Sequence, residues 1–274
     1  MALSLLVLID FHDPADYALA YADRLAGAIG ARLVLLHVRR DALLDPEHFS
    51  GTLADLHTEA IALAFASLER GLTAPAVAET GHGLVAEAVA RAVLKHQPLL
   101  LVLGRTDGGS TPDELLTPLA VALLRTITCP LLVVPASAVA RAAPRRVLLA
   151  VDGEPFALGP YTGAVRHLLD ALPAALTVLH VLPPGGVDEL PHHALESVQR
   201  TGLADDLVAP TRPRRVAAPH PAEGILRVAK PAEFDLVALV ARPRSFLGQL
   251  FHRSVTAQVL LHSPLPVLVL PAME

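Results

Sequence analysis

The chain alternates short, continuous apolar runs with longer segments in which apolar residues recur at helical spacing. The first run, Leu5–Asp10, stays apolar up to its final aspartate, which is typical of a strand covered by helices on both faces. Helical spacing follows over Pro14–Ile29, and a second apolar run occupies Arg32–Val38. A strand, a helix and a strand with short connections predict a right-handed parallel unit.

The rest of this pattern predicts an open α/β sheet. Further helices are expected near 55–70, 84–96 and 119–126, and further strands at 74–79, 99–103 and 131–134. Five parallel strands with helices on both faces bind ligands beyond the carboxyl ends of the strands, where the strand order reverses. The loops after the first, second and fourth strands are therefore the candidate binding loops.

The whole pattern occurs a second time. Three segments of the first half return in the same order in the second half, at Val147–Asp152, Ala174–Val181 and Leu265–Pro271. Such a repeat indicates a tandem duplication, so function is expected at equivalent positions of the two halves. The second half is shorter between its second and fourth strands, where 187–213 replaces a longer helical connection.

The joint between the two halves is expected in 136–144, where small residues show no apolar periodicity. We place the boundary near 140, which divides the chain into domains 1–140 and 141–274, called half one and half two below. The 274 residues are enough for two domains of common size, each able to bury a core without disulfides or metals.

Composition sets the environment in which this fold is expected. Hydrophobic residues make up 53% of the chain and aromatic residues only 4%, which suits helices packed on buried strands through Ala, Leu and Val. The net charge of -5 gives no general attraction to nucleic acid or to anionic membranes, so neither is expected as a partner. No apolar run reaches the roughly 18 residues typical of a transmembrane helix.

The single cysteine and the first residues both favour a cytoplasmic protein. Cys129 cannot form an intrachain disulfide, fits a reducing compartment, and lies in an apolar strand where we interpret it as a packing residue. The N-terminal run lacks a basic region and continues into the repeated strand, so we interpret it as a strand and not as a signal peptide.

Polar residues close the first two strands of each half. Asp10 and Asp152 follow strand one, where a carboxylate can accept hydrogen bonds from a ribose or a base amine, or can cap the following helix. Both interpretations stay open at this point. His37 and His180 end strand two, and we interpret them as packed, hydrogen-bonded residues and not as catalytic groups.

After the fourth strand the two halves differ. The loop Gly104–Ser110 has glycines that let backbone N–H groups face a phosphate, ahead of a helix whose dipole favours an anion. Half two has Ala241–Ser245 and Leu250–Thr256, which hold three arginines around a helix start and form a denser anion-binding set. A solvated basic loop, with Ser254 as an ordinary N-cap, is the alternative.

Histidines after the third strand are further candidates for a place beside the same binding loops. His82 and His220 are expected at equivalent positions, but no HxxxH or CxxC spacing accompanies them, and we expect no structural metal. His192 and His193 are expected at the surface. The sequence has no Walker A, GxSxG or HExxH motif, which removes the best support for nucleophilic or metal-assisted hydrolysis.

Together these features resemble a tandem universal stress protein over essentially the whole chain. The matching features are the strand-one aspartates, the Leu-His-Val of strand two, the glycine loop and the two closing strands. The resemblance implies a Rossmann-like, adenine nucleotide alpha-hydrolase-like sheet of five parallel strands in each half. It also implies that the halves pair as a pseudo-dimer, with 131–134 beside 267–270. A further homodimer and an unknown protein partner stay open.

ATP-binding members of that family share a Gly-x2-Gly-x9-Gly-Ser/Thr motif, and this chain departs from it in both halves. Half one keeps Gly104 in the first place but has Asp107 in the second and Thr117–Pro118 in the last. The acidic side chain repels a triphosphate and the proline removes a backbone donor, although Gly108 and Gly109 compensate if the loop shifts by one residue.

Half two keeps only the serine of this motif. Val240 and Pro243 stand where the first two glycines are expected, so the backbone cannot approach a phosphate as closely. Arg242, Arg244 and Arg253 could hold an anion by their side chains instead, because the guanidinium group matches phosphate geometry.

The implied function is a non-catalytic stress response through binding of a ligand or partner, the ligand being ATP, another adenine nucleotide or a small anion. Slow nucleotide hydrolysis through Asp10 or Asp152 with bound Mg²⁺ is one alternative, although each site offers a single carboxylate. A scaffold without a small ligand is the other. The candidate ligand-binding residues are Asp10, Val38, Gly104, Asp107, Gly108, Gly109 and Thr117 in half one, and Asp152, Val181, Ala241, Arg242, Arg244, Arg253, Ser254 and Val255 in half two.

Overall fold

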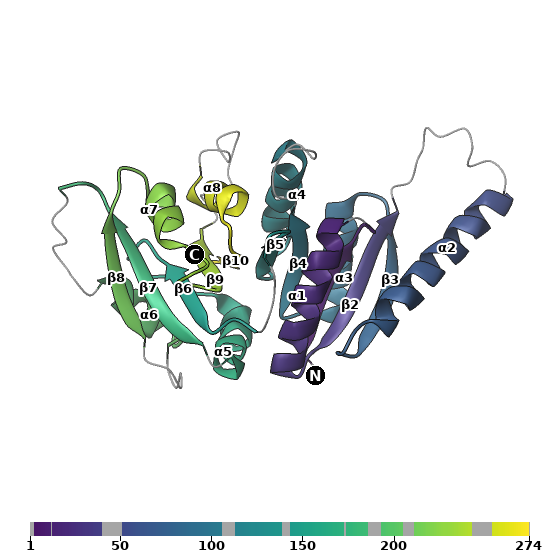
Figure 1. Cartoon of the computed structure of the whole chain (residues 1–274), viewed down its shortest axis with the longest axis horizontal. Coiled ribbons are helices and arrows are strands. Elements are labelled where there is room, and N and C mark those ends of the chain that lie inside the picture. Colours follow the sequence, from purple (N-terminus) through teal and green to yellow (C-terminus); the bar gives the residue numbers. More distant parts are fainter. Residues whose placement is uncertain are drawn as a thin grey trace.

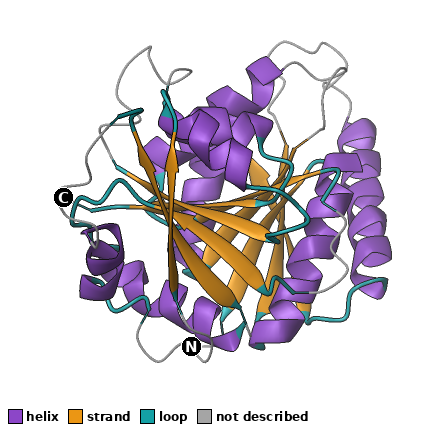
Figure 2. Ribbon diagram, turned by 60° about the vertical axis from the view of Figure 1, so that its left-hand side comes forward, coloured by secondary structure: helices purple, strands orange, loops and turns teal. Residues whose placement is uncertain are grey.

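The strands of both halves join into one sheet with helices on both faces (Figure 1, Figure 2). The computed structural model describes residues 3–11, 13–39, 51–105, 113–138, 143–172, 174–185, 193–204, 211–242 and 254–273. Half one contains β1 (Ser4–Ile9), α1 (Asp13–Ile29), β2 (Arg32–Arg39), α2 (Gly51–Arg70), β3 (Ala76–His82), α3 (Val85–His96), β4 (Leu100–Arg105), α4 (Asp113–Thr126) and β5 (Leu131–Pro135).

Half two repeats this order with shorter connections. Its elements are β6 (Arg146–Ala150), the 3-10 turn η2 (Gly159–Tyr161), α5 (Thr162–Ala171), β7 (Ala175–Leu182), α6 (His193–Arg200), β8 (Arg212–Ala217), α7 (Pro221–Val228), β9 (Leu236–Ala241), α8 (Val255–His262) and β10 (Val267–Pro271). The expected shortening lies at α6, which has 8 residues where α2 has 20.

One helix start differs from the sequence-based expectation. We predict a helix near 119–126, whereas α4 begins at Asp113 and continues through Pro118. A proline has no N–H to donate and is expected to end a helical pattern, but α4 includes Pro118 as its sixth residue, where one hydrogen bond of the helix is lost. The helix therefore begins earlier than its apolar periodicity indicates.

The strand order is β3-β2-β1-β4-β5-β10-β9-β6-β7-β8, which places the two halves back to back. All pairings within each half are parallel, and β5 and β10 pair antiparallel in the centre of the sheet (Figure 1). Val133 lies opposite Val267 and Leu132 opposite Leu268, which confirms the expected pairing of 131–134 with 267–270. In each half the order reverses beside the first strand, between β1 and β4 and between β6 and β9.

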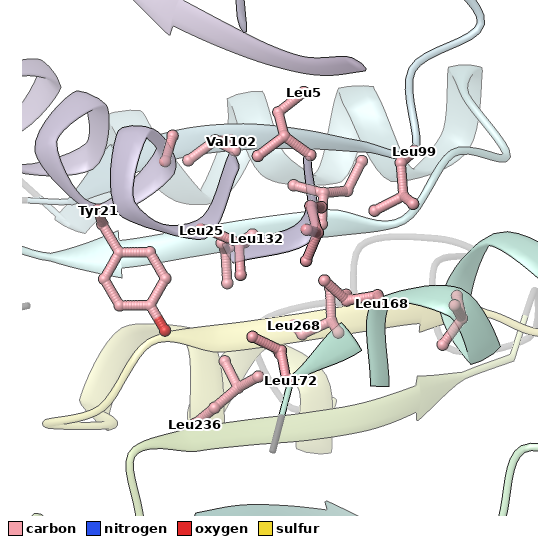
Figure 3. Packing of buried hydrophobic residues seen from close by; sticks show 14 of the residues in the cluster. Leu5, Tyr21, Leu25, Leu99, Val102, Leu132, Leu168, Leu172, Leu236 and Leu268 are labelled. Carbon is pink, nitrogen blue, oxygen red and sulfur yellow. The ribbon is translucent and has the colours of Figure 1, made fainter. Parts of the chain in front are cut away.

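The apolar core continues across the junction between the halves. Figure 3 shows Leu25 and Leu132 of half one facing Leu268 and Leu172 of half two. Tyr21 lies at the rim of this layer with its hydroxyl directed toward half two, and burial raises the pKa of its phenol. The halves therefore share one hydrophobic layer, built from leucine as the composition suggests.

The structure tests the prediction for Cys129 but not the predicted domain boundary. Cys129 is fully buried and burial raises the pKa of its thiol to about 12, which confirms the packing interpretation. The domain boundary near 140 falls among 139–142, which lie outside the described residues, and it stays a prediction. Within the described parts, no helix combines the length and apolarity needed to cross a membrane.

Candidate functional site

A pocket of about 260 Å³ opens in half two where the strand order reverses. Its walls come from the ends of β6, β7 and β9 and from the starts of α7 and α8. Val181, Ile225 and Leu239 are among its apolar lining residues, and Asp152 and Arg242 are among its polar ones. Four of the expected candidates, Asp152, Val181, Arg242 and Val255, therefore line one cavity at the predicted edge of the sheet.

The turn after β6 sets the direction of the Asp152 carboxylate. Gly153 has a φ of 83°, a left-handed conformation that glycine adopts without the steric penalty of a side chain. The turn brings the backbone N–H of Glu154 within 3.1 Å of Asp152 Oδ1, to which it donates a hydrogen bond. The carboxylate thus accepts a bond from its own loop instead of capping α5.

Arg242 binds Asp152 with two hydrogen bonds. Its Nε donates to Oδ2 at 2.8 Å and its Nη2 donates to Oδ1 at 2.9 Å, the bidentate geometry that suits a guanidinium and a carboxylate. Arg242 also donates to the carbonyl oxygens of Glu154 at 3.0 Å and Pro155 at 3.1 Å. The hydrogen bonds to Asp152 hold the pKa of Arg242 above its ordinary value despite partial burial, so the pair is ionic.

This pairing changes the chemistry expected from the two residues. The sequence suggests Arg242 as an arginine for an anion and Asp152 as an acceptor for a ligand, but in the structure each is the partner of the other. They meet because Asp152 follows β6 and Arg242 follows β9, which are neighbouring strands. The result is a directional ion pair beside an apolar pocket, with the Arg242 side chain only 15% exposed and a second carboxylate, Glu154 Oε2, 3.5 Å from Arg242 Nε.

His180 supports the same turn from the neighbouring strand. Its Nδ1 lies 3.2 Å from the carbonyl oxygen of Val151, which can only accept, so Nδ1 donates. In the neutral imidazole, Nε2 is then left as an acceptor. A Cβ atom at Gly153 would lie 3.4 Å from Cε1 of His180, so the glycine keeps the space beside this ring open. The interpretation of His180 as a packed, hydrogen-bonded residue is confirmed.

Half one has the same hydrogen bond between a strand-two histidine and the end of its first strand, and aromatic rings pack against that histidine. Nδ1 of His37 donates to the carbonyl oxygen of Ile9 at 2.9 Å, as His180 does to Val151. Phe11 occupies the place of Gly153, also left-handed with a φ of 58°. Its ring centroid lies 4.7 Å from that of His37 and 5.5 Å from that of Phe65 in α2. The aromatic cluster packs on the side of the sheet covered by α1, whereas the half-two pocket lies on the side covered by α7 and α8.

The remaining candidates fall in three groups. Sheet pairing places Gly104 beside Val134 and Val240 beside Leu270, which agrees with the alignment of Gly104 with Val240. Ser254 caps α8, because its Oγ accepts a hydrogen bond from the N–H of Ala257 at 3.1 Å. Val255 lines the pocket. Of the others, Thr117 lies in α4, and the residues at strand ends are Asp10, Val38 and Ala241. Asp107, Gly108, Gly109, Arg244 and Arg253 lie outside the described residues.

The equivalence of the two histidines after strand three is wrong. Val38 pairs with Gly81 and Val181 pairs with Val216, so the counterpart of His82 is Ala217. His220 is instead the N-cap residue of α7. The turn between strand and helix differs in the two halves, which moves the second histidine off the strand. Among the residues that the structure describes, no three His, Cys, Asp or Glu side chains are grouped to hold a metal ion.

Sequence reasoning missed the part of the pocket wall that α7 supplies. Pro221 and Ile225 line the cavity, yet neither follows a strand directly, so the search for strand-end loops passes over them. It also missed the contrast between Phe11 and Gly153. A residue-by-residue alignment of the two repeats just after the aspartates carries that signal, because it sets a large aromatic side chain against none.

Comparison with known proteins places both halves in one family. A sequence model of the universal stress protein family matches residues 1–135 and 144–271. A universal stress protein from Archaeoglobus fulgidus DSM 4304 is 16% identical, with a TM-score of 0.70 over 98% of each chain. A functionally unknown protein from Pseudomonas aeruginosa PAO1 is 21% identical, with a TM-score of 0.56 over 99% of this chain and 93% of that chain. No curated protein matches.

Proposed function

This chain belongs to the universal stress protein family, with two copies of its domain, and we propose that it is a non-catalytic stress-response protein that acts by binding a small ligand. The ligand is an adenine nucleotide or another small anion, and we place its site in half two, where described residues line a pocket. The observation that carries this proposal is the Asp152–Arg242 pair at the mouth of the apolar pocket.

The pocket has the character of a small-molecule site. Such sites combine apolar walls with a few polar groups that fix orientation, in cavities of about 300–1,000 Å³ for drug-sized ligands. The cavity of about 260 Å³ is slightly smaller, which suits a nucleoside-sized group with its charged part outside. Val255 and Thr256 open α8 and line the cavity, so the positive end of the helix dipole favours an anionic group there.

The state of the aspartate supports binding over catalysis. Both oxygens of Asp152 accept hydrogen bonds from Arg242, and one also accepts from the backbone of Glu154. A general base or a magnesium ligand needs a carboxylate that is presented to the substrate or the ion. Here the carboxylate is held by a guanidinium, which favours a recognition role for the pair over slow nucleotide hydrolysis.

The experiment is to identify what the purified protein carries. Mass spectrometry of material released on denaturation should find a nucleotide or another small anion, and calorimetry with AMP and ATP should detect binding heat. Arg242→Gln should weaken that binding by about tenfold or more, because a charge-assisted pair contributes roughly 1.5–3 kcal/mol. Arg212→Gln, which removes an exposed arginine on β8, is the matched control.

Two outcomes would overturn the proposal. A protein that releases nothing and gives no heat with either nucleotide would favour the scaffold without a ligand. Steady phosphate release from ATP, lost in Arg242→Gln, would favour the hydrolase instead.

A further inference from the structure

The helix that opens onto the half-two pocket is held at its other end by half one. Val255 and Thr256, at the start of α8, line the pocket. At the end of the same helix, Arg105 of β4 donates from Nη2 to the carbonyl oxygen of Ser263 at 2.6 Å and from Nη1 to that of Leu261. Arg105 is only 8% exposed, so this contact between the halves is sealed from solvent.

The chemistry of this contact suits a helix end. The last carbonyl groups of a helix have no partner within the helix, and a cation placed there interacts favourably with the helix dipole. The forked guanidinium can bind two carbonyl oxygens at once, which an ammonium group does less rigidly. Because α8 has only 8 residues and short helices are marginal on their own, contacts at its ends fix its position.

Arg105 is itself firmly placed. It is the last residue of β4, it pairs with Pro135 of β5, and its carbonyl oxygen accepts the N–H of Ala136 at 2.8 Å. Sheet pairing gives the counterpart in half two as Ala241, which pairs with Pro271 in the same register. The alanine side chain is too short to reach half one, so Ala241 cannot make the contact that Arg105 makes with half two.

We propose that Arg105 is a positioning residue for the half-two pocket. Half one supplies the side chain that holds α8 against the junction, and this sets where Val255 and Thr256 stand in the pocket wall. The half-two site is thus completed by a residue of half one. This inference rests on the proposed function for its effect on ligand binding, but its effect on α8 can be measured without a ligand.

The test compares Arg105→Met with Arg105→Lys in the full chain. Arg105→Met keeps an unbranched apolar stem but is shorter and lacks the guanidinium donors, and it should weaken AMP binding by about tenfold, within the range usual for coupled sites. Arg105→Lys should recover part of the affinity. Leu132→Val loosens the junction at β5 without touching α8 and should lower the melting temperature with AMP affinity unchanged.

Hydrogen exchange supplies the ligand-independent measurement. Amides of 255–262 should exchange faster in Arg105→Met, while those of 221–228 in α7 should keep their wild-type rates. Unchanged exchange in α8 of the folded variant would overturn the inference, as would an equal loss of AMP affinity in Leu132→Val. If the wild-type protein binds no AMP, the proposed function fails, and the exchange rates alone still decide the role of Arg105.

Discussion

The two halves keep the same aspartate and histidine at their strand ends, but the residue after the aspartate differs. In half one Phe11 packs against His37 with ring centroids 4.7 Å apart, and in half two a Cβ atom at Gly153 would lie 3.4 Å from Cε1 of His180. Arg242 of half two binds the aspartate beside the pocket. Duplication has thus preserved the hydrogen bond that anchors each histidine, while the turn beside it has diverged.

The largest loss of stability should come from removing an anchor in half one. Asp23 of α1 accepts hydrogen bonds from the N–H groups of Thr73 at 3.0 Å and Ala74 at 2.8 Å, and from the Thr73 hydroxyl at 2.9 Å. Asp23→Ala should lower the free energy of unfolding by about 1–3 kcal/mol, because it leaves the buried N–H of Ala74 unpaired. Urea denaturation measures this loss.

The matched variant lies in α5. Arg166, which occupies the corresponding place before β7, forms an ion pair with Asp170 at 3.8 Å, in which both side chains are more than a third exposed. Arg166→Ala should therefore change the free energy of unfolding by less than about 0.5 kcal/mol. Equal losses in the two variants would show that Asp23 is no special anchor.

Helix packing beside the pocket gives the next contrast. A Cβ atom at Gly224 of α7 would lie 2.5 Å from Cγ1 of Val181, whereas the corresponding residue of α3 is Ala88. Gly224→Ala should be destabilising, since overpacking costs about 1–3 kcal/mol and better helix propensity returns at most about 1 kcal/mol. A rise in melting temperature would mean that α7 can move away from β7 without cost.

Exchanging the turn residues between the halves tests the comparison itself. Gly153→Phe should lower the free energy of unfolding by about 1–2 kcal/mol, the cost of a left-handed bulky residue, and should abolish ligand binding in half two. Phe11→Gly relieves the same strain but loses two ring contacts of about 0.5–1.5 kcal/mol each and the burial of a partly buried ring, so it should be destabilising by about 1–3 kcal/mol. Calorimetric titration that still detects full binding in Gly153→Phe would contradict the account.

The smallest expected effect is on how the free energy of unfolding depends on pH, and it comes from Asp235, which lies just before β9. Burial would raise the pKa of Asp235, but hydrogen bonds from the Arg146 guanidinium and the backbone N–H groups of Arg145 and Arg146 outweigh burial and lower it. Its stabilising contribution is therefore present above the unfolded pKa of about 3.9 and is lost as pH falls through the lower folded value.

Half one has neutral residues, Ser4 and Leu99, at the places of Arg146 and Asp235. Asp235→Asn should thus flatten the loss of stability below about pH 4, by less than about 1 kcal/mol because solvent screens the pair. If the free energies of unfolding of wild type and variant fall in parallel down to pH 2, the ion pair does not contribute to the acid sensitivity.

Much of the fold follows from the repeated apolar runs, since they predict the strands and their parallel order, while the family resemblance adds the pairing of 131–134 with 267–270. The site is less accessible to such reasoning. Asp152 and Arg242 can each be named as candidates, but their ion pair depends on the turn at Gly153 and on the adjacency of β6 and β9. The role of Arg105 is harder still, because its partners lie across the junction, in a helix of the other half.

The most direct test of the central claim, that half two holds the ligand, is a calorimetric titration of AMP with its stoichiometry. The account predicts one molecule bound per chain, with binding lost in Gly153→Phe, weakened in Arg242→Gln and retained in Asp10→Asn. Two molecules per chain, or loss of binding in Asp10→Asn with full binding in Arg242→Gln, would contradict it.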